Sequence, residues 1–181
     1  MINYRESDGQ SIIHLINLLP QEHIVGAEIG LWEAHTFCSL LECCPRIKTL
    51  YGIDPYQPYV DTIDEESMVV DSDMIMQVKI RALTNIMSTG LQNKVLFVED
   101  TSENSVDLIE NNELDFIFVD SYINQKHALE ELNRWYPKVK TGGIFSGHDY
   151  NSIKHVVDQF RKENNIINNM SVFDQTFVWI K

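Results

Sequence analysis

Short apolar segments alternate with amphipathic segments along most of the chain, and this alternation limits the possible folds more than any other feature of the sequence. Five segments have the length and apolar character of buried strands. They are Ile24–Ile29, Ile47–Ile53, Val95–Val98, Asp115–Val119 and Ile144–Ser146. Because segments with helical periodicity lie between them, the order predicts a parallel sheet with right-handed crossovers. We therefore expect a doubly wound, Rossmann-like α/β fold.

The C-terminal residues extend this sheet. Residues 171–180 have the pattern of two short strands joined by a tight turn, which adds an antiparallel edge. We expect a seven-stranded sheet, mostly parallel, with an antiparallel last strand. The chain has 181 residues, enough for one full core, so a single domain over residues 1–181 is expected, with an N-terminal helix inside residues 1–20.

A long helix is predicted between the second and third strands. Met76, Ile80, Leu83 and Met87 recur at helical spacing and mark its apolar face, and Gly90 suits a C-terminal cap. The preceding residues, 56–73, are acidic and irregular. Because long connections are often functional, they form a candidate lid over a substrate, with an ordinary connection as the alternative.

Gly142 and Gly143 predict a turn into the fifth strand.

The charge balance excludes several classes of partner. Acidic residues outnumber basic ones by 27 to 14, which gives a formal net charge of −13. Such a surface repels phosphate backbones and anionic headgroups, so neither nucleic acid nor membrane is expected as a partner. No signal-peptide core is seen, and no apolar run approaches the ~20 residues that cross a bilayer, which predicts a cytoplasmic protein. Three clustered cysteines without a CxxC pair predict neither a zinc site nor a disulfide.

The residues that follow the strands are the candidates for function. In an open α/β sheet, ligands bind beyond the carboxyl ends of the strands, near the point where the strand order switches direction. The residues at these positions are Gly30, Asp54, Asp100, Asp120 and the pair His148-Asp149.

The turn after the first strand, Glu28–Ala34, contains one glycine flanked by acids. A dinucleotide needs several glycines, because backbone amides wrap its pyrophosphate. S-adenosylmethionine has no phosphate and carries a sulfonium and an ammonium group, so it suits an acidic turn with one glycine. Asp54, after the second strand, can accept both ribose hydroxyls. A cap of the turn before Pro55 is the alternative for Asp54.

Longer motifs give these residues a context. The motifs are Ala27–Glu33, Gly52–Tyr56, Asp115–Asp120, Trp135–Gly143 and Gly147–Tyr150. Through them the chain resembles the class I S-adenosylmethionine-dependent methyltransferases, especially the compact branch that acts on small molecules and has Gly-His-Asp after the fifth strand. The resemblance covers nearly the whole chain, and the family's seventh strand is antiparallel.

The resemblance implies contacts with the methionine end of the cofactor. Glu28 and Gly30, with the adjacent Leu31, would line this end. Asp120 would lie beside the methionine moiety and the substrate. Trp32 would cover the cofactor, with a role in packing as the alternative.

The resemblance also implies contacts with the nucleoside. Asp54, followed by Pro55, would hold the ribose, and Asp100 with Thr101 would contact adenine. One departure lies near this site, because Ala34 stands where the family often has glycine. We expect Ala34 to be tolerated one turn into the following helix.

A second departure concerns the chemistry. Where the branch often reads Asp-x-Asp-His-x-Tyr after the fourth strand, this chain has Asp120–Gln125 without the second Asp, the His or the Tyr. This puts in doubt any metal or proton-transfer role that those side chains serve in relatives.

Asp120, His148 and Asp149 are expected to meet at the mouth of the site. Methyl transfer from a sulfonium needs proximity, alignment and exclusion of water, and a hydroxyl acceptor also needs a base or a metal. His148 with Asp120 is the candidate catalytic pair, with His148 as a metal-free base. Alternatively, Asp120, His148 and Asp149 hold a divalent metal, softer than magnesium because one ligand is a histidine. In a third interpretation, His148-Asp149 only caps the next helix.

The sequence thus predicts an enzyme that transfers a methyl group from S-adenosylmethionine to a small-molecule acceptor, at a hydroxyl oxygen. A non-catalytic module that binds S-adenosylmethionine is the first alternative, because of the departures after Asp120. A nicotinamide-dependent oxidoreductase is the second, although the single glycine and the terminal hairpin count against it. The sequence leaves the acceptor and the oligomeric state open.

Overall fold

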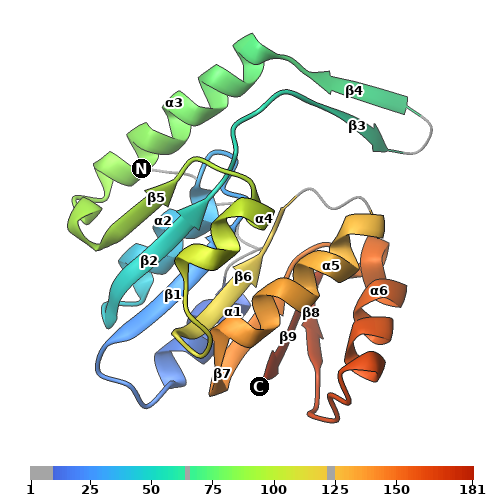
Figure 1. Cartoon of the computed structure of the whole chain (residues 1–181). Helices are drawn as coiled ribbons and strands as arrows, with labels where there is room; N and C mark the ends of the chain where they lie inside the picture. The colour runs from blue at the N-terminus through green and yellow to red at the C-terminus, as the bar shows by residue number, and fades with distance from the viewer. Residues whose placement is uncertain (1–9, 64–65, 122–124) are drawn as a thin grey trace.

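A single sheet with helices on both faces makes up the body of the molecule in the computed structural model (Figure 1). The structure describes residues 10–63, 66–121 and 125–181. The α-helices are α1 (Gln10–Leu18), α2 (His35–Cys43), α3 (Ser72–Ser88), α4 (Ser102–Ser105), α5 (Gln125–Trp135) and α6 (Tyr150–Glu163). The strands are β1 (Ile24–Ile29), β2 (Ile47–Ile53), β3 (Tyr59–Ile63), β4 (Glu66–Val70), β5 (Val95–Val98), β6 (Leu114–Val119), β7 (Val139–Gly147), β8 (Ser171–Phe173) and β9 (Thr176–Ile180). Short 3-10 turns cover Gln92–Lys94, Val106–Leu108 and Tyr136–Lys138.

The main sheet has seven strands in the spatial order β5-β2-β1-β6-β7-β9-β8. The first five run parallel, β9 is antiparallel to β7, and β8 is antiparallel to β9. This arrangement confirms the expected doubly wound fold with its antiparallel edge. The chain builds outward from β1 to one side and then from β6 to the other, so the switch point lies between β1 and β6.

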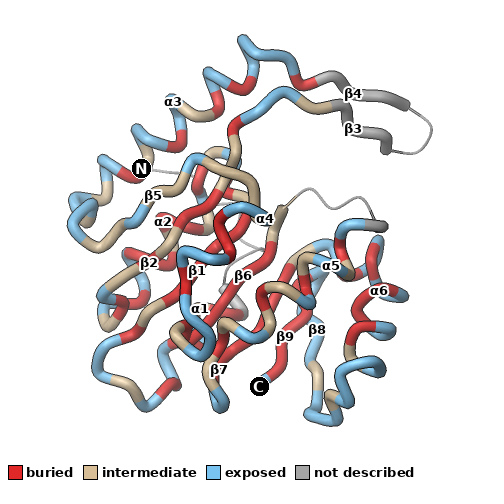
Figure 2. The backbone as a smooth tube through the Cα atoms, viewed as in Figure 1, coloured by how far each residue is buried: buried red, intermediate tan, exposed pale blue. Residues whose placement is uncertain are grey.

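Two apolar layers hold the helices on the sheet. One layer packs α1, α2 and α3 against the first face, and the other packs α5, α6 and the 3-10 turn after α4 against the second. All six residues of β6 are buried, as expected for a central strand covered on both faces. Figure 2 shows this buried centre in red, with exposed residues on the outer sides of the helices.

The described part of residues 56–73 contains regular secondary structure. β3 and β4 pair as an antiparallel hairpin, with Tyr59 opposite Val70. The hairpin projects beyond the carboxyl ends of the parallel strands and continues into α3, whose N-cap is Asp71 (Figure 1). The prediction of an irregular segment was therefore wrong, while its role as a lid stays a prediction.

α3 forms where it was expected, but a different face of it is buried. Ile75, Val78, Ala82 and Ile86 pack into the core. The predicted apolar face, which begins at Met76, is exposed. The correct row was not distinguishable because both rows of α3 are apolar at helical spacing.

The glycine pair before the fifth strand lies inside β7 rather than in a turn leading to it. β7 begins at Val139, and its register against β6 shifts between Leu114 and Phe116. Gly142 takes a positive φ of 84° at this irregularity, a conformation that glycine adopts without steric cost. The expected turn is thus a bulge within a longer strand.

Within the described residues, no helix combines the length and the apolar character that a membrane crossing requires.

A buried carboxylate fixes the start of β6 beside β1. Asp115 is fully buried, and its Oδ2 accepts a hydrogen bond of 2.8 Å from the backbone N–H of Val25. Its Oδ1 accepts a hydrogen bond of 2.7 Å from Nζ of Lys140 on β7. One side chain therefore links three neighbouring strands at the amino end of the sheet.

Replacing this carboxylate should destabilise the whole domain. Asp115→Ala removes both acceptors and leaves the Val25 amide without its partner, so we expect the free energy of unfolding to fall by about 2–4 kcal/mol. Urea denaturation measures the change. Lys154→Ala, which removes an exposed pair with Asp158, is the control and should cost less than about 1 kcal/mol. Equal urea midpoints for the two variants would contradict the structural role of Asp115.

Candidate active site

The hydrogen-bond ladder of the parallel strands continues one residue past their ends. Four backbone amides make these bonds with N···O distances of 2.7–3.1 Å: Gly30 to Ile53, Asp54 to Val98, Asp120 to Ile29 and His148 to Val119. Adjacent strands are ~4.8 Å apart. Four of the predicted site positions therefore stand in one row along the carboxyl edge of the sheet, in the order Asp54, Gly30, Asp120, His148.

The carboxylate of Asp54 shapes the turn after β1. Its Oδ2 accepts hydrogen bonds from the backbone N–H groups of Leu31 and Trp32, at 2.9 and 3.1 Å. Its Oδ1 accepts one from the N–H of Tyr56, at 2.8 Å. A carboxylate has about four acceptor sites, so Asp54 holds the turn and retains capacity for a ligand hydroxyl.

Gly30 is required by its conformation and by its neighbours. Its φ is 85°, and a Cβ atom at this position would lie 2.3 Å from the carbonyl oxygen of Asp120. The chain leaving β1 thus passes against the chain leaving β6 with no room for a side chain. This close approach lies at the switch point, where the strand order leaves an opening for a ligand.

Ala34 does not lie inside a helix, as the sequence suggested, but at the N-cap of α2 in the left-handed region, with φ 60°. Trp32 also has a positive φ, of 48°. The phenol of Tyr56 donates a hydrogen bond to the carbonyl of Trp32 at 2.9 Å, and its ring stacks on Phe97. Tyr56 therefore stabilises the turn after β1, a role that no pattern in the sequence indicated.

Glu28, one residue before the end of β1, is a buried carboxyl group with only 1% of its surface exposed. Within the described residues, its Oε2 has no hydrogen-bond partner. Burial raises the pKa of Glu28 well above the ordinary value, and the charges of Asp120 and Asp54 raise it further. A cationic ligand group at this free oxygen would stabilise the ionised form.

These groups open into a cavity of about 1250 Å³ at the carboxyl edge of the sheet. Its lining contains most of the residues predicted to bind the cofactor: Glu28, Gly30, Leu31, Trp32, Asp54, Pro55, Thr101 and Asp120. Asp149 also lines it. Asp100 is not among its described lining residues. The Oδ1 of Asp100 instead accepts hydrogen bonds from the Thr101 N–H and Asn104 Nδ2, at 2.7 and 2.9 Å, which lower the pKa of Asp100.

The cavity lining is strongly acidic. Its carboxyl groups are those of Glu28, Glu33, Asp54, Glu103, Asp120, Glu130, Glu131 and Asp149. Among the described lining residues, Arg134 provides the one lysine or arginine side chain, and it pairs with Glu103 at 2.7 Å and Glu130 at 3.8 Å. The electrostatic potential of the cavity therefore favours neutral or cationic ligands.

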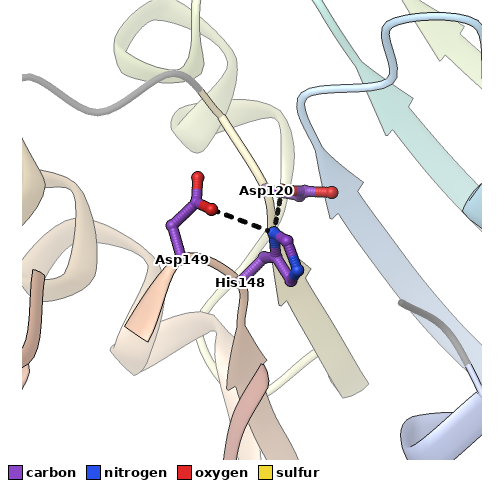
Figure 3. Close-up of side chains that lie close together, drawn as sticks. All are labelled: Asp120, His148 and Asp149. Atoms are coloured by element: carbon purple, nitrogen blue, oxygen red, sulfur yellow. Dashed lines mark ion pairs between the residues drawn. The ribbon is translucent and has the colours of Figure 1, made fainter. Parts of the chain in front are cut away.

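Asp120, His148 and Asp149 lie close together (Figure 3). Asp120 and Asp149 line the cavity, whereas His148 is not among its described lining residues. Nδ1 of His148 lies 3.4 Å from Oδ1 of Asp120 and 3.2 Å from Oδ1 of Asp149. One donor atom from each residue lies within 4.8 Å of the others, a spacing that suits a metal ion. The set of two carboxylate oxygens and one imidazole nitrogen suits a divalent transition metal.

The structure does not support the helix-cap interpretation of His148-Asp149. Asp149 occupies the N-cap of α6 in a left-handed conformation with φ 54°, but within the described residues its side chain makes no cap hydrogen bond. It turns toward His148 instead. Hydrogen bonds to Asp120 and Asp149 raise the pKa of His148 to about 10, so the imidazole carries a proton at neutral pH.

Glu131 on α5 is a cavity residue that was not among the candidates from the sequence. Its Oε2 accepts a hydrogen bond of 2.6 Å from Ser121, directly after Asp120. Burial raises the pKa of Glu131. No sequence signal could have singled it out, because an acid on an amphipathic helix normally faces solvent. His127 on the same helix is exposed and also lines the cavity.

A family model described as a methyltransferase domain matches residues 27–150. This span runs from β1 to the first residue of α6 and includes all four positions of the strand-end row. The chain belongs to the class I S-adenosylmethionine-dependent methyltransferases.

Solved structures share the fold of this methyltransferase. The O-methyltransferase NovP is 17% identical, with a TM-score of 0.68 over 94% of this chain and 79% of that one. An rRNA methylase from Streptococcus thermophilus is 10% identical, with a TM-score of 0.65 over 94% of both chains. A Streptococcus mutans structure assigned to the methyltransferases, in complex with S-adenosylhomocysteine, is 11% identical, with a TM-score of 0.63 over 98% of this chain and 97% of that one. A search of curated proteins gave no significant match.

Membership in this family identifies S-adenosylmethionine as the cofactor. It decides against the nicotinamide-dependent alternative and agrees with the single glycine of the β1 turn. Family membership does not assign individual cofactor contacts or the methyl acceptor. Those assignments are argued from the residues of this chain's own cavity.

The ionisation of His148 can be tested directly. Its pKa in the folded, metal-free protein is about 10, above the ordinary 6.5, so folding favours the protonated ring. The resulting stabilisation is fully present below about pH 6.5 and is lost as the pH rises to about 10. Proton–nitrogen NMR of the ring, assigned by its loss in His148→Gln, should show an imidazolium at neutral pH.

Asp149→Asn is the matched change. It removes one of the two carboxylates and should lower the pKa of His148. The decline in unfolding free energy above neutral pH should become smaller. A His148 ring that titrates near 6.5 in the unmodified protein would contradict the ion-pair arrangement.

Proposed function

We propose that this methyltransferase transfers the methyl group of S-adenosylmethionine to a hydroxyl oxygen of a small neutral or cationic molecule. One observation carries the proposal: the turn after β1 (Glu28–Ala34, called the cofactor turn below) contributes residues to the same acidic cavity as Asp120 and Asp149, which hold His148 between them. A hydroxyl acceptor needs groups that favour its deprotonation. The acidic cluster that could provide them lies beside the residues proposed to bind the cofactor.

The charge distribution supports a small molecule over RNA as the acceptor. The fold is shared with both an O-methyltransferase and an rRNA methylase, so fold alone does not choose between them. RNA binding relies on unpaired lysine and arginine side chains that neutralise phosphates. Here the chain carries a formal charge of −13, and Arg134 in the cavity already pairs with two glutamates.

The residues of the β1 turn fit the cofactor in charge and in space. The free oxygen of Glu28 suits the ammonium group of the methionine end, and Gly30 allows the ligand to approach the backbone. Asp54 suits a ribose hydroxyl through its remaining acceptor capacity. Thr101, whose hydroxyl accepts the N–H of Asn104 at the start of α4, suits the adenine side of the cavity.

In the proposed mechanism, the protein aligns an acceptor hydroxyl with the methyl group and excludes water. When bound, S-adenosylmethionine would supply a methyl group on a positively charged sulfur: the acceptor oxygen would bond to the methyl carbon as the sulfur–methyl bond breaks, and neutral S-adenosylhomocysteine would leave. Asp120 and Asp149, which both line the cavity, would orient the hydroxyl. A doubly protonated His148 cannot accept a further proton, so His148 alone is a poor base at neutral pH.

We propose that Asp120, His148 and Asp149 hold a divalent cation during turnover. Such a cation would lower the pKa of the acceptor hydroxyl, which would release its proton to solvent before the methyl group is transferred. His148 would lose its proton on metal binding, and its nitrogen ligand would favour a softer metal than magnesium. In this mechanism the carboxylates of Asp120 and Asp149 would stabilise a protonated His148 in the metal-free enzyme. In the active enzyme the same carboxylates would bind the metal.

The assignment of Asp54 predicts a loss of cofactor affinity on substitution. Asp54→Asn keeps the shape of the side chain but removes its charge and replaces one acceptor oxygen by a donor. We expect S-adenosylhomocysteine to bind roughly 10- to 100-fold more weakly, as for loss of a charged hydrogen bond of about 1.5–3 kcal/mol. Isothermal titration calorimetry measures the affinity.

Glu99→Gln is the control for this change. Glu99 also lies at the end of a strand, but it is exposed and pairs with Lys79 at the surface. Its substitution should leave the affinity unchanged. Thermal melts without ligand separate a loss of binding from a loss of folding. Unchanged affinity in a folded Asp54→Asn protein would contradict the ribose assignment.

The acceptor class can be tested by transfer of a labelled methyl group to a panel of compounds. We expect transfer to small neutral or cationic compounds with hydroxyl groups, and none to ribosomal RNA fragments or phosphorylated compounds.

The metal is tested separately. A chelator should abolish turnover but leave S-adenosylhomocysteine affinity intact, and Mn²⁺ should restore more activity than Mg²⁺. Methylated RNA would overturn the proposed acceptor class, and chelator-resistant turnover would overturn the metal.

A further inference from the structure

α3 carries two apolar rows, and the core uses only one of them. The inner row, Ile75, Val78, Ala82 and Ile86, is buried. The outer row consists of Met76, Ile80, Leu83 and Met87, with exposed fractions of 54%, 56%, 37% and 65%. We call these four residues the outer stripe. α3 lies at the margin of the molecule, with exposed residues along its outer side (Figure 2).

The spacing of the outer stripe is that of a helix–helix seam. Its residues follow one another at intervals of four, three and four, the repeat of a and d positions in a coiled coil. A row of scattered surface apolar residues would not keep this repeat over three helical turns. The stripe is therefore suited to pack against another helix.

The stripe is also symmetric about its own centre. A two-fold axis across α3 between Arg81 and Ala82 exchanges Met76 with Met87 and Ile80 with Leu83. Interfaces between identical subunits related by a two-fold axis require this self-complementarity. The partner that fits the stripe best is thus the same helix in a second copy.

Charge favours an antiparallel pair. Asp73 continues the stripe at its N-terminal end, so a parallel pair would bring two Asp73 side chains together, whereas an antiparallel pair separates them and aligns the helix dipoles favourably. Lys79 and Arg81 pair with Glu99 and Glu33 of the same chain. Two copies can therefore approach along α3 despite the acidic surface elsewhere.

We propose that two copies of this chain associate through antiparallel packing of their outer stripes, with Ile80 of each copy against Leu83 of the other. The interface uses no residue of the cofactor turn or of the Asp120–His148–Asp149 cluster. The proposal is therefore independent of the proposed acceptor and metal.

The mass of the protein in solution tests association. Analytical ultracentrifugation over a dilution series should give a species of twice the 21.0 kDa chain mass, which dissociates on dilution. Ile80→Glu and Leu83→Lys, each alone, should shift the protein to monomer. Both positions are exposed in the single chain, so both variants should fold, which circular dichroism checks.

Mixing the two variants tests the orientation. In the antiparallel pair, Glu at position 80 of one copy faces Lys at position 83 of the other, so the mixture should regain the dimer. A parallel pair would place position 80 against position 80 and gain nothing from mixing. Leu108→Lys and Ile167→Glu change exposed apolar residues elsewhere and should leave the mass unchanged.

A monomeric unmodified protein at all concentrations would overturn the proposal, and so would a dimer that survives both stripe substitutions. A dimer that both substitutions break but mixing does not restore would overturn the antiparallel arrangement.

Discussion

Four backbone hydrogen bonds at the carboxyl edge of the sheet determine where everything else in this enzyme can lie. Each bond joins the residue after one parallel strand to the end of its neighbour. These residues therefore keep the regular spacing of the sheet although they belong to turns. Asp54, Gly30, Asp120 and His148 come from distant parts of the sequence, and the ladder alone fixes their order and approximate separation.

The chemistry of the site follows from how charges are placed along this row. Asp54 uses its carboxylate to hold the turn, while Glu28 is buried with one free oxygen, and these two acids surround a glycine that admits close approach. Farther along the row, two carboxylates share one imidazole. The same excess of negative charge that suits a cationic cofactor thus also determines the protonation of His148.

Much of the fold could be read from the sequence because the central strands are apolar runs that end at a glycine, an acid or a histidine. The bounds of β1, β2 and β5 agree with the prediction for this reason. The buried face of α3 could not be read, since Met76 and Ile75 begin two equally apolar rows and only tertiary packing selects one. Most site residues could be predicted because they directly follow a strand. Tyr56 and Glu131 could not, because their roles depend on contacts between distant segments of the chain, which no local sequence pattern indicates.

The left-handed residues around the cavity have a consequence for redesign of this enzyme. Trp32 and Asp149 both line the cavity, and both have positive φ angles, of 48° and 54°. A β-branched or bulky residue is strained in this region, and only glycine, asparagine and aspartate enter it readily. In a library aimed at new acceptors, members with β-branched residues at these two positions would carry a backbone strain of about 1–3 kcal/mol per position. Gln57 also lines the cavity, is exposed and is not among the described residues with a positive φ, so specificity can be diversified there at less cost to the fold.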